Sequence, residues 1–359
     1  MANPSDKIAP QSVDPQAETF PLPNFRLQCG VTLPAAKLVY RTFGTLNRDR
    51  TNAILYPTSY GAQHTDTQWL VGPGKILDSD RYFIIIPNMF GNGLSSSPSN
   101  LPEFFGEGTD GTTTRPTFTH VDNITAQRRL LHERFGIERL ALVYGWSMGG
   151  QQALHWGALY PEEVERICAV CTSARTSPHN FVFLEGLRTA ITADPAWNGE
   201  RFVAKPERGL RAFGRVYAGW ALSQAFYRER LYETLGYTSL EDFLVRDWEA
   251  SFLKRDASNL LSMLDTWQRS DISANETFRG DLPAALRAIL AHTLIMPGSH
   301  DLYFTPEDAL AEARLISHAE YRPIESIWGH RAGNPARNPT DEAFLKRAVD
   351  ELLARGKPE

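Results

Sequence analysis

The chain has 359 residues, a formal net charge of −5, 42% hydrophobic residues and 22% charged residues. These proportions are typical of a soluble globular protein. An acidic balance offers no basic surface for nucleic acid or for an anionic membrane, so we expect neither as a partner. The length is compatible with two domains, or with a single α/β core that carries a large insertion.

The start of the chain and its cysteines indicate a compartment. Residues 1–16 are polar and lack the apolar centre of a secretory signal. Three cysteines are an odd number, which argues against a disulfide framework. Cys168 and Cys171 have C-x-x-C spacing, but they fall in a predicted strand whose residues three apart face opposite sides, so we interpret both as buried thiols. We expect a cytoplasmic protein with a loose N-terminal tail over residues 1–20.

Short apolar runs alternate with helical patterns in the first half of the chain. A proline-rich and glycine-rich stretch, residues 88–115, is too long for a simple connection and suggests a covering loop. Residues 120–131 have helical spacing. The runs that predict strands are residues 38–43, 53–56, 81–87, 140–144 and 164–171.

The fourth of these strands runs directly into a Gly-x-Ser-x-Gly motif centred on Ser147, and good helix formers follow it. A sharp strand-to-helix turn requires the small residues Gly145 and Gly149 two positions either side of the serine. Such a turn lifts the Ser147 hydroxyl above the sheet. It also aims the first helical N–H groups, that of Met148 first, at the same point, where they can stabilise an oxyanion.

A second oxyanion donor is expected from the loop that follows residues 53–56. The backbone N–H of Tyr60 is our candidate, and that of Ser59 is the second choice. The alternative is that residues 57–61 form a plain connecting loop.

The alternation of strands and helices stops at about residue 174. The following stretch has helical patterns and many aromatic side chains. We interpret residues 176–286 as a helical lid over the C-terminal edge of the sheet, in which some aromatics line a pocket and most pack the lid onto the core. Strand patterns resume at residues 292–297 and 319–324. The chain therefore predicts an α/β fold whose mostly parallel sheet has helices on both faces, formed by residues 21–175 and 287–359.

Asp301 and His330 each follow a predicted strand, in the chain order Ser, Asp, His that this catalytic arrangement uses. His330 would take the Ser147 proton, and Asp301 would hold the imidazole. The alternatives are a helix cap for Asp301 and an exposed loop position for His330. His300, which lies directly beside Asp301 in the sequence, is the alternative candidate for the catalytic histidine. No zinc motif or phosphate-binding glycine loop is present in the sequence, so we expect no metal and no cofactor.

Several stretches resemble the homoserine O-acetyltransferase family of α/β-hydrolases, and the resemblance runs from about residue 20 to residue 353. It implies Ser147, Asp301 and His330 as the catalytic triad and Tyr60 as an oxyanion donor. It also implies a lid over a buried tunnel and a homodimer formed through the lids. The matching stretches are residues 40–47, 70–75, 80–83, 145–154 and 188–195.

Trp146 and Arg188 lie within matching stretches, and we expect both to contact the substrate. Other positions depart from the family. Arg331 follows His330 where the family has an aspartate that helps to hold the homoserine amine. In the lid, Arg215 stands one position later than the arginine that binds the homoserine carboxylate. Trp220 begins the pair that replaces the expected Thr-Tyr. We include Arg215 and Trp220 among the candidate substrate contacts.

These departures indicate a neutral substrate, because a buried charge without its partner costs several kcal/mol. We therefore predict a serine esterase that hydrolyses small acetate esters, with no partner other than a small-molecule ester and a second copy of the chain. The alternative is a homoserine O-acetyltransferase that uses acetyl-CoA, with Arg215 or Arg331 binding a carboxylate from a shifted position. An inactive binding module is the third hypothesis.

Overall fold

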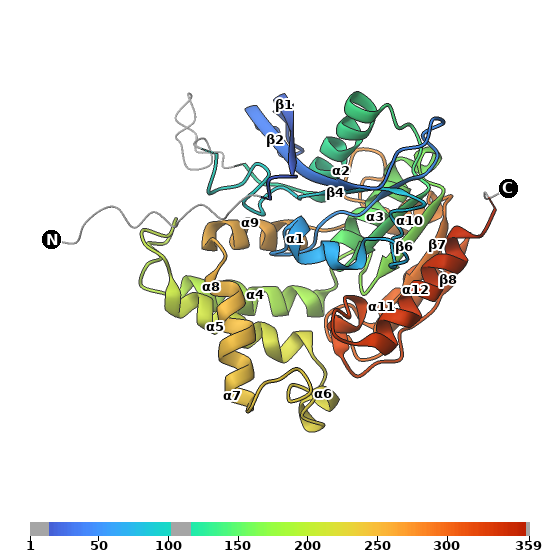
Figure 1. Ribbon diagram of the computed structural model, residues 1–359. Coiled ribbons are helices and arrows are strands. Elements are labelled where there is room, and N and C mark those ends of the chain that lie inside the picture. Colours follow the sequence, from blue (N-terminus) through green and yellow to red (C-terminus); the bar gives the residue numbers. More distant parts are fainter. Residues whose placement is uncertain (1–13, 102–115, 357–359) are drawn as a thin grey trace.

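A single mixed sheet organises the computed structural model, which describes residues 14–101 and 116–356. The strand order is β1-β2-β4-β3-β5-β6-β7-β8 (Figure 1). The first two strands are antiparallel to their neighbours, and β4, β3 and β5 to β8 are parallel. The strands are β1 (Glu18–Arg26), β2 (Thr32–Phe43), β3 (Ala53–Leu55), β4 (Phe83–Pro87), β5 (Leu142–Trp146), β6 (Arg166–Val170), β7 (His292–Met296) and β8 (Ala319–Tyr321).

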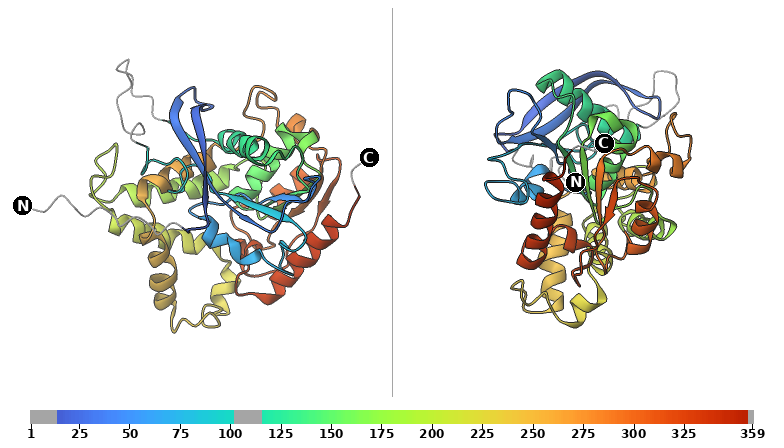
Figure 2. Two further views of the ribbon diagram at one scale, coloured as in Figure 1. Left: turned by 45° about the horizontal axis from the view of Figure 1, so that its top comes forward. Right: turned by 90° about the vertical axis from the view of Figure 1, so that its right-hand side faces the viewer.

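Helices cover both faces of the sheet, as the edge-on view in Figure 2 shows. One hydrophobic cluster joins the sheet to α2, α3, α10 and α11. The opposite cluster joins it to α12 and to the segment around α1. The predicted α/β fold is thereby confirmed. The core helices are α1 (His64–Thr67), α2 (His120–Arg129), α3 (Met148–Leu159), α10 (Leu282–Arg287), α11 (Pro306–Ala313) and α12 (Pro339–Leu353).

A helical lid with its own hydrophobic cluster lies beside the core, in the lower half of Figure 1. Met89, Met148, Tyr303 and Phe304 of the core belong to this cluster, so the lid packs directly over the start of α3. The lid helices are α4 (Pro178–Thr192), α5 (Glu207–Ala221), α6 (Gln224–Arg228), α7 (Leu240–Phe243), α8 (Ala250–Leu253) and α9 (Ala257–Gln268).

The two ends of the lid are bonded to each other. Thr176 N donates to Ser270 O at 2.9 Å, and Ile272 N donates to Ala174 O at 3.0 Å. Arg175 and Asp271 form an ion pair at 2.6 Å. Helix α10, which the sequence assigned to the lid, packs in the core cluster with α3. The lid therefore ends near residue 271 and not at the predicted residue 286.

The N-terminal strand was missed from the sequence. Strand β1 begins at Glu18, so the predicted loose tail of residues 1–20 already includes strand residues, and residues 1–13 lie outside the described part. Prolines at positions 21 and 23 argue against a strand, yet β1 pairs only with β2 and is an edge strand, where a missing N–H is tolerated.

The predicted covering loop follows β4. Residues 88–101 are mostly buried, and the rest of the predicted covering loop, residues 102–115, lies outside the described part.

Cys168 and Cys171 are both buried free thiols, as predicted. Cys171, however, lies just beyond β6 with a φ of 45°, so it is not a strand residue.

No helix in the described ranges is long and apolar enough to cross a membrane.

Candidate active site

Ser147 occupies a strained turn between β5 and α3. Its φ of 57° and ψ of −128° lie in a region that residues with a side chain rarely adopt. A Cβ at Gly145 would lie 2.2 Å from Gly149 O, and a Cβ at Gly149 would lie 2.6 Å from Pro57 O. Both glycines are therefore required by close backbone approach, as the sequence motif indicated. Ser147 itself is 2% exposed.

The loop after β3 is attached to this turn. The Ser59 hydroxyl donates to Trp146 O and accepts from Gly149 N at 3.4 Å. Within the described residues, the backbone amides of Tyr60 and Met148 donate no hydrogen bond. Both N–H groups are therefore available as donors, and their role as oxyanion donors stays a prediction. The Ser59 side chain instead holds the two segments together.

Asp301 and His330 form a buried pair. His330 Nδ1 donates to Asp301 Oδ2 at 2.6 Å, and the two residues are 2% and 4% exposed respectively. Asp301 Oδ1 also accepts from the backbone N–H groups of Tyr303 and Phe304 at 3.1 and 3.2 Å. Because Nδ1 carries the proton, the Nε2 lone pair of the neutral imidazole is free to accept one. Asp301 does not cap α11, since Thr305 does so.

The strand-to-helix turn at Ser147 contacts the loop that carries His330. The Trp146 indole N–H donates to His330 O at 3.2 Å, and the two rings lie 5.0 Å apart. Cys171 Sγ, an Asp301 oxygen and a His330 nitrogen lie within 4.8 Å of one another. Burial raises the pKa of the Cys171 thiol, so it remains protonated behind the acid. The rival His300 is exposed and contacts Ser299.

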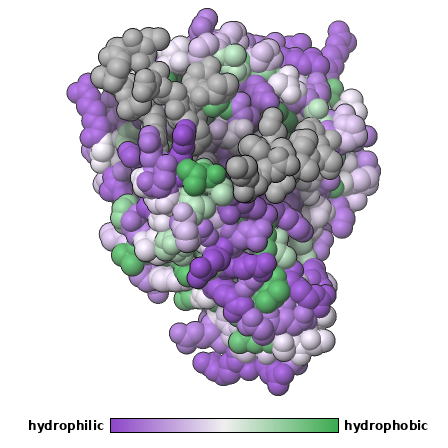
Figure 3. Space-filling model, turned by 90° about the vertical axis from the view of Figure 1, so that its left-hand side faces the viewer, coloured by the Kyte–Doolittle hydropathy of each residue, from purple (hydrophilic) through white to green (hydrophobic). Residues whose placement is uncertain are grey.

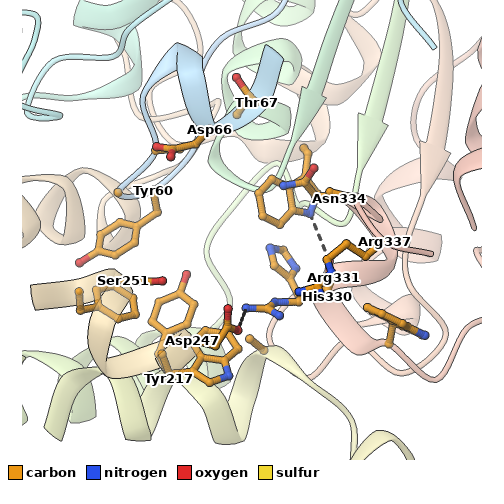
Figure 4. A pocket seen from close by; sticks show the side chains of 18 of the residues that line it. Tyr60, Asp66, Thr67, Tyr217, Asp247, Ser251, His330, Arg331, Asn334 and Arg337 are labelled. Atoms are coloured by element: carbon orange, nitrogen blue, oxygen red, sulfur yellow. Dashed lines mark hydrogen bonds and ion pairs between the residues drawn. The ribbon is translucent and has the colours of Figure 1, made fainter. Parts of the chain in front are cut away.

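A cavity of about 410 Å³ lies between the core and the lid, in front of His330 (Figure 4). The core supplies one wall and the lid the other. The core residues that line it include Tyr60, Asp66, Thr67, Trp146, Tyr303, Trp328, His330, Arg331, Asn334 and Arg337, and the lid residues include Tyr217, Ala221, Leu235, Asp247, Trp248, Ser251, Phe252 and Arg255.

The acidic groups in this wall are both paired. Arg331 contacts Asp247 at 2.6 Å and lies over the Trp248 ring at 4.4 Å from its centroid. Asp66 pairs with Arg255 at 2.7 Å. The cavity therefore presents no unpaired carboxylate to a bound amine, and the Arg331 guanidinium is already engaged.

The structure separates the four candidate substrate contacts. Trp146 lines the cavity. Arg188 does not; it binds Asp265 and Gln268 within the lid. Arg215 pairs with Glu249 and Glu241, also away from the cavity. Trp220 packs on Phe183, with ring centroids 5.0 Å apart, and likewise does not line the cavity. Only Trp146 is thus placed where it can contact a ligand there.

Among the residues that line the cavity, reasoning from the sequence missed four that bear on its chemistry. Tyr303 stands two positions after Asp301, a proximity that could have flagged it. Tyr217 and Trp248 were only two of many lid aromatics, and nothing in the sequence marked which would reach the cavity. Asp247 carried no signal, because its pairing with Arg331 joins positions that are 84 residues apart.

The sheet order, the strained serine and the acid–histidine pair together are those of an α/β-hydrolase. The family model described as alpha/beta hydrolase fold matches residues 74–327, and the chain belongs to this family.

Individual relatives narrow this placement. The chain is 41% identical to the ethyl acetate hydrolase of Pseudomonas veronii over 86% of this chain and 87% of that one. It matches the structure of an acetylester hydrolase from Corynebacterium glutamicum with a TM-score of 0.87, 35% identity, and coverage of 94% and 96% of the two chains. It is 32% identical to the homoserine O-acetyltransferase of Methanococcus vannielii, over 88% of this chain and 69% of that one. The resemblance found in the sequence is confirmed, with esterases among the relatives.

We predict that Gly149→Ala lowers the esterase rate by at least about tenfold, because the new Cβ would press on Pro57 O and separate the two segments that carry the free amides. Steady-state kinetics and thermal unfolding are to be measured together. Gly186→Ala is the matched control, since a Cβ there meets nothing within 4 Å. Equal rates for Gly149→Ala and wild type would contradict the assigned geometry.

Proposed function

We propose that this protein hydrolyses acetate esters of small neutral alcohols through an acyl intermediate on Ser147. The observation that carries the proposal is a cavity in front of His330 in which Arg331 is already paired with Asp247. A neutral ester can enter such a cavity without breaking the Arg331–Asp247 pair. The hydrolases of ethyl acetate and of acetyl esters among the relatives support the same substrate class.

In the proposed acylation, His330 Nε2 takes the Ser147 proton as Oγ attacks the ester carbonyl. The amides of Tyr60 and Met148 would donate to the oxyanion. Asp301 stabilises the imidazolium through the 2.6 Å contact at Nδ1. His330 then gives the proton to the departing alcohol oxygen, and acetyl-Ser147 remains.

In the proposed deacylation, a water molecule gives its proton to His330 Nε2 and adds to the acetyl carbonyl. The bond from the acetyl carbon to Oγ breaks, acetate leaves, and Ser147 regains its proton from His330. The protein returns to its starting state with no cofactor consumed.

The second candidate function is acetyl transfer from acetyl-CoA to homoserine. The homoserine O-acetyltransferase relative favours it, since both reactions share the acyl-serine intermediate. Homoserine carries an amine and a carboxylate, and the contacts of Arg331 and Arg215 leave neither guanidinium free for that carboxylate. Arg337, which donates to Leu235 O at the cavity wall, is the remaining guanidinium that such a carboxylate could meet. An inactive binding module is disfavoured by the intact set of serine, acid and histidine.

We predict that Ser147→Ala lowers ester hydrolysis by about 10⁴-fold or more, because the nucleophile is removed while the fold is kept. Hydrolysis of ethyl acetate and p-nitrophenyl acetate is measured beside acetylhomoserine formation from acetyl-CoA. A serine-directed fluorophosphonate should label wild type at Ser147 and leave Ser147→Ala unlabelled. Acetylhomoserine formation with negligible ester hydrolysis would overturn the proposal in favour of the transferase, and an unlabelled wild type would favour the binding module.

The Asp247–Arg331 pair gives a test of substrate charge. Asp247→Asn leaves Arg331 without its counter-ion in the cavity wall, so the ratio of kcat/KM for the anionic ester acetoxyacetate to that for ethyl acetate should rise about tenfold. Glu241→Gln removes a carboxylate that pairs with Arg215 away from the cavity, and it should leave the ratio unchanged. An unchanged ratio in Asp247→Asn would mean that the substrate does not meet this pair.

A homodimer through the lids is part of the proposal. Among the described residues, the large hydrophobic side chains that are exposed lie mainly on the lid, with Val182 on α4 63% exposed and Val203 64% exposed. The face in Figure 3 is largely hydrophilic, with small separate hydrophobic patches. Such residues are candidates for a partner surface.

We predict that light scattering finds a dimer for wild type and a monomer for Val182→Glu, because the charge would be buried in the interface. Leu290→Glu, on an exposed position of the core, should remain dimeric. A wild type that is monomeric at micromolar concentration would contradict the dimer.

We also propose that the enzyme works in the cytoplasm. The three thiols Cys29, Cys168 and Cys171 are all free, which suits a reducing compartment.

A further inference from the structure

Two polar atoms that are buried at the cavity have no hydrogen-bond partner among the described residues. One is His330 Nε2 and the other is the Tyr303 hydroxyl oxygen. Both residues line the cavity, Tyr303 is 1% exposed, and the two ring centroids are 4.3 Å apart. Buried polar groups in native proteins nearly always have a partner, so two unpaired groups at one place require an explanation.

The Tyr303 side chain is held firmly in this position. Its backbone N–H donates to Asp301 Oδ1 at 3.1 Å, which fixes the chain beside the acid. Its ring stacks on Phe183 of the lid, with centroids 5.1 Å apart and planes 2° apart. The stack therefore fixes the position of the hydroxyl oxygen. The O–H group can still rotate, and the Tyr217 hydroxyl lies close enough to act on the pKa of Tyr303.

The chemical characters of the two atoms are complementary. Nε2 is an acceptor while Nδ1 donates to Asp301. Burial raises the pKa of the Tyr303 hydroxyl well above its ordinary value, so the phenol keeps its proton and can donate. No hydrogen bond joins them, and an oxygen that contacts both would give each atom a partner. A water molecule or an alcohol has the donor and acceptor capacity that this position requires.

We propose that Tyr303 is a further catalytic residue whose hydroxyl donates a hydrogen bond to the oxygen with which His330 exchanges a proton. The inference rests on the esterase function proposed above and deepens it. During acylation this oxygen is that of the departing alcohol, which takes the proton from Nε2 as its bond to the carbonyl carbon breaks. During deacylation it is that of the attacking water, which gives a proton to Nε2. Tyr303 keeps its own proton throughout.

Tyr217 from the lid lies on the other side of this position. Its hydroxyl points into the cavity between Tyr60 and His330 in Figure 4, and its ring lies 6.3 Å from that of Tyr303.

The test compares Tyr303→Phe with wild type on ethyl acetate and p-nitrophenyl acetate. Ethoxide is a poor leaving group and needs the donated hydrogen bond, whereas nitrophenolate departs without help. We expect kcat/KM for ethyl acetate to fall about tenfold or more, while kcat/KM for p-nitrophenyl acetate changes less than about threefold. Thermal stability should stay the same or rise, because an unpaired buried hydroxyl is removed.

Tyr144→Phe is the matched control, since it removes another buried, unpaired hydroxyl that does not line the cavity. It should leave kcat/KM for both esters unchanged. A parallel fall for both esters in Tyr303→Phe, or no fall for ethyl acetate, would overturn the role of the hydroxyl. If wild type hydrolyses neither ester and Ser147 takes no fluorophosphonate label, the esterase proposal fails instead. The two failures are therefore distinguishable.

Discussion

The left-handed backbone at Ser147 is the constraint on which the rest of the site depends. A positive φ at a residue with a side chain costs of order 1–3 kcal/mol and persists only where the surroundings enforce it. Here Ser147 N donates to Val170 O, Thr172 Oγ1 donates to Ser147 O, and Ser59 bonds both sides of the turn. The sheet thus provides the packing and hydrogen bonds that hold the buried serine in one orientation.

The sequence could reveal those features of the fold and the site that short local patterns determine. Short local patterns, such as the glycines around Ser147 and the apolar run before Asp301, predict the turn at Ser147, the parallel strands and the loops that carry the acid and the histidine. Local patterns do not specify which distant residues meet. Arg188 and Arg215 stand in or near stretches that resemble a family motif, yet their charges are used within the lid. Asp247, which shapes the cavity, could be found only from the folded chain.

Electrostatic pairing gives the cavity its character. Asp247, Arg331, Asp66 and Arg255 would each be costly in an enclosed site if left alone, and they form two pairs of opposite charge. Arg337, which also lines the cavity, donates to the carbonyl oxygen of Leu235. The Asp247–Arg331 pair also joins the lid to the loop that carries His330. The same contact therefore bears on both the charge of the cavity wall and the position of the lid.

The bonds between the two ends of the lid have a consequence for how such a protein can change. Because Ala174 and Ile272 are hydrogen-bonded to each other, nearly a hundred residues leave the core and return to it at one place. An insertion with adjacent ends places little constraint on the sheet that carries it. The lid can thus be replaced or reshaped during evolution while the sheet, the turn at Ser147 and the acid–histidine pair stay as they are. One catalytic core can acquire new substrates by exchanging a single module.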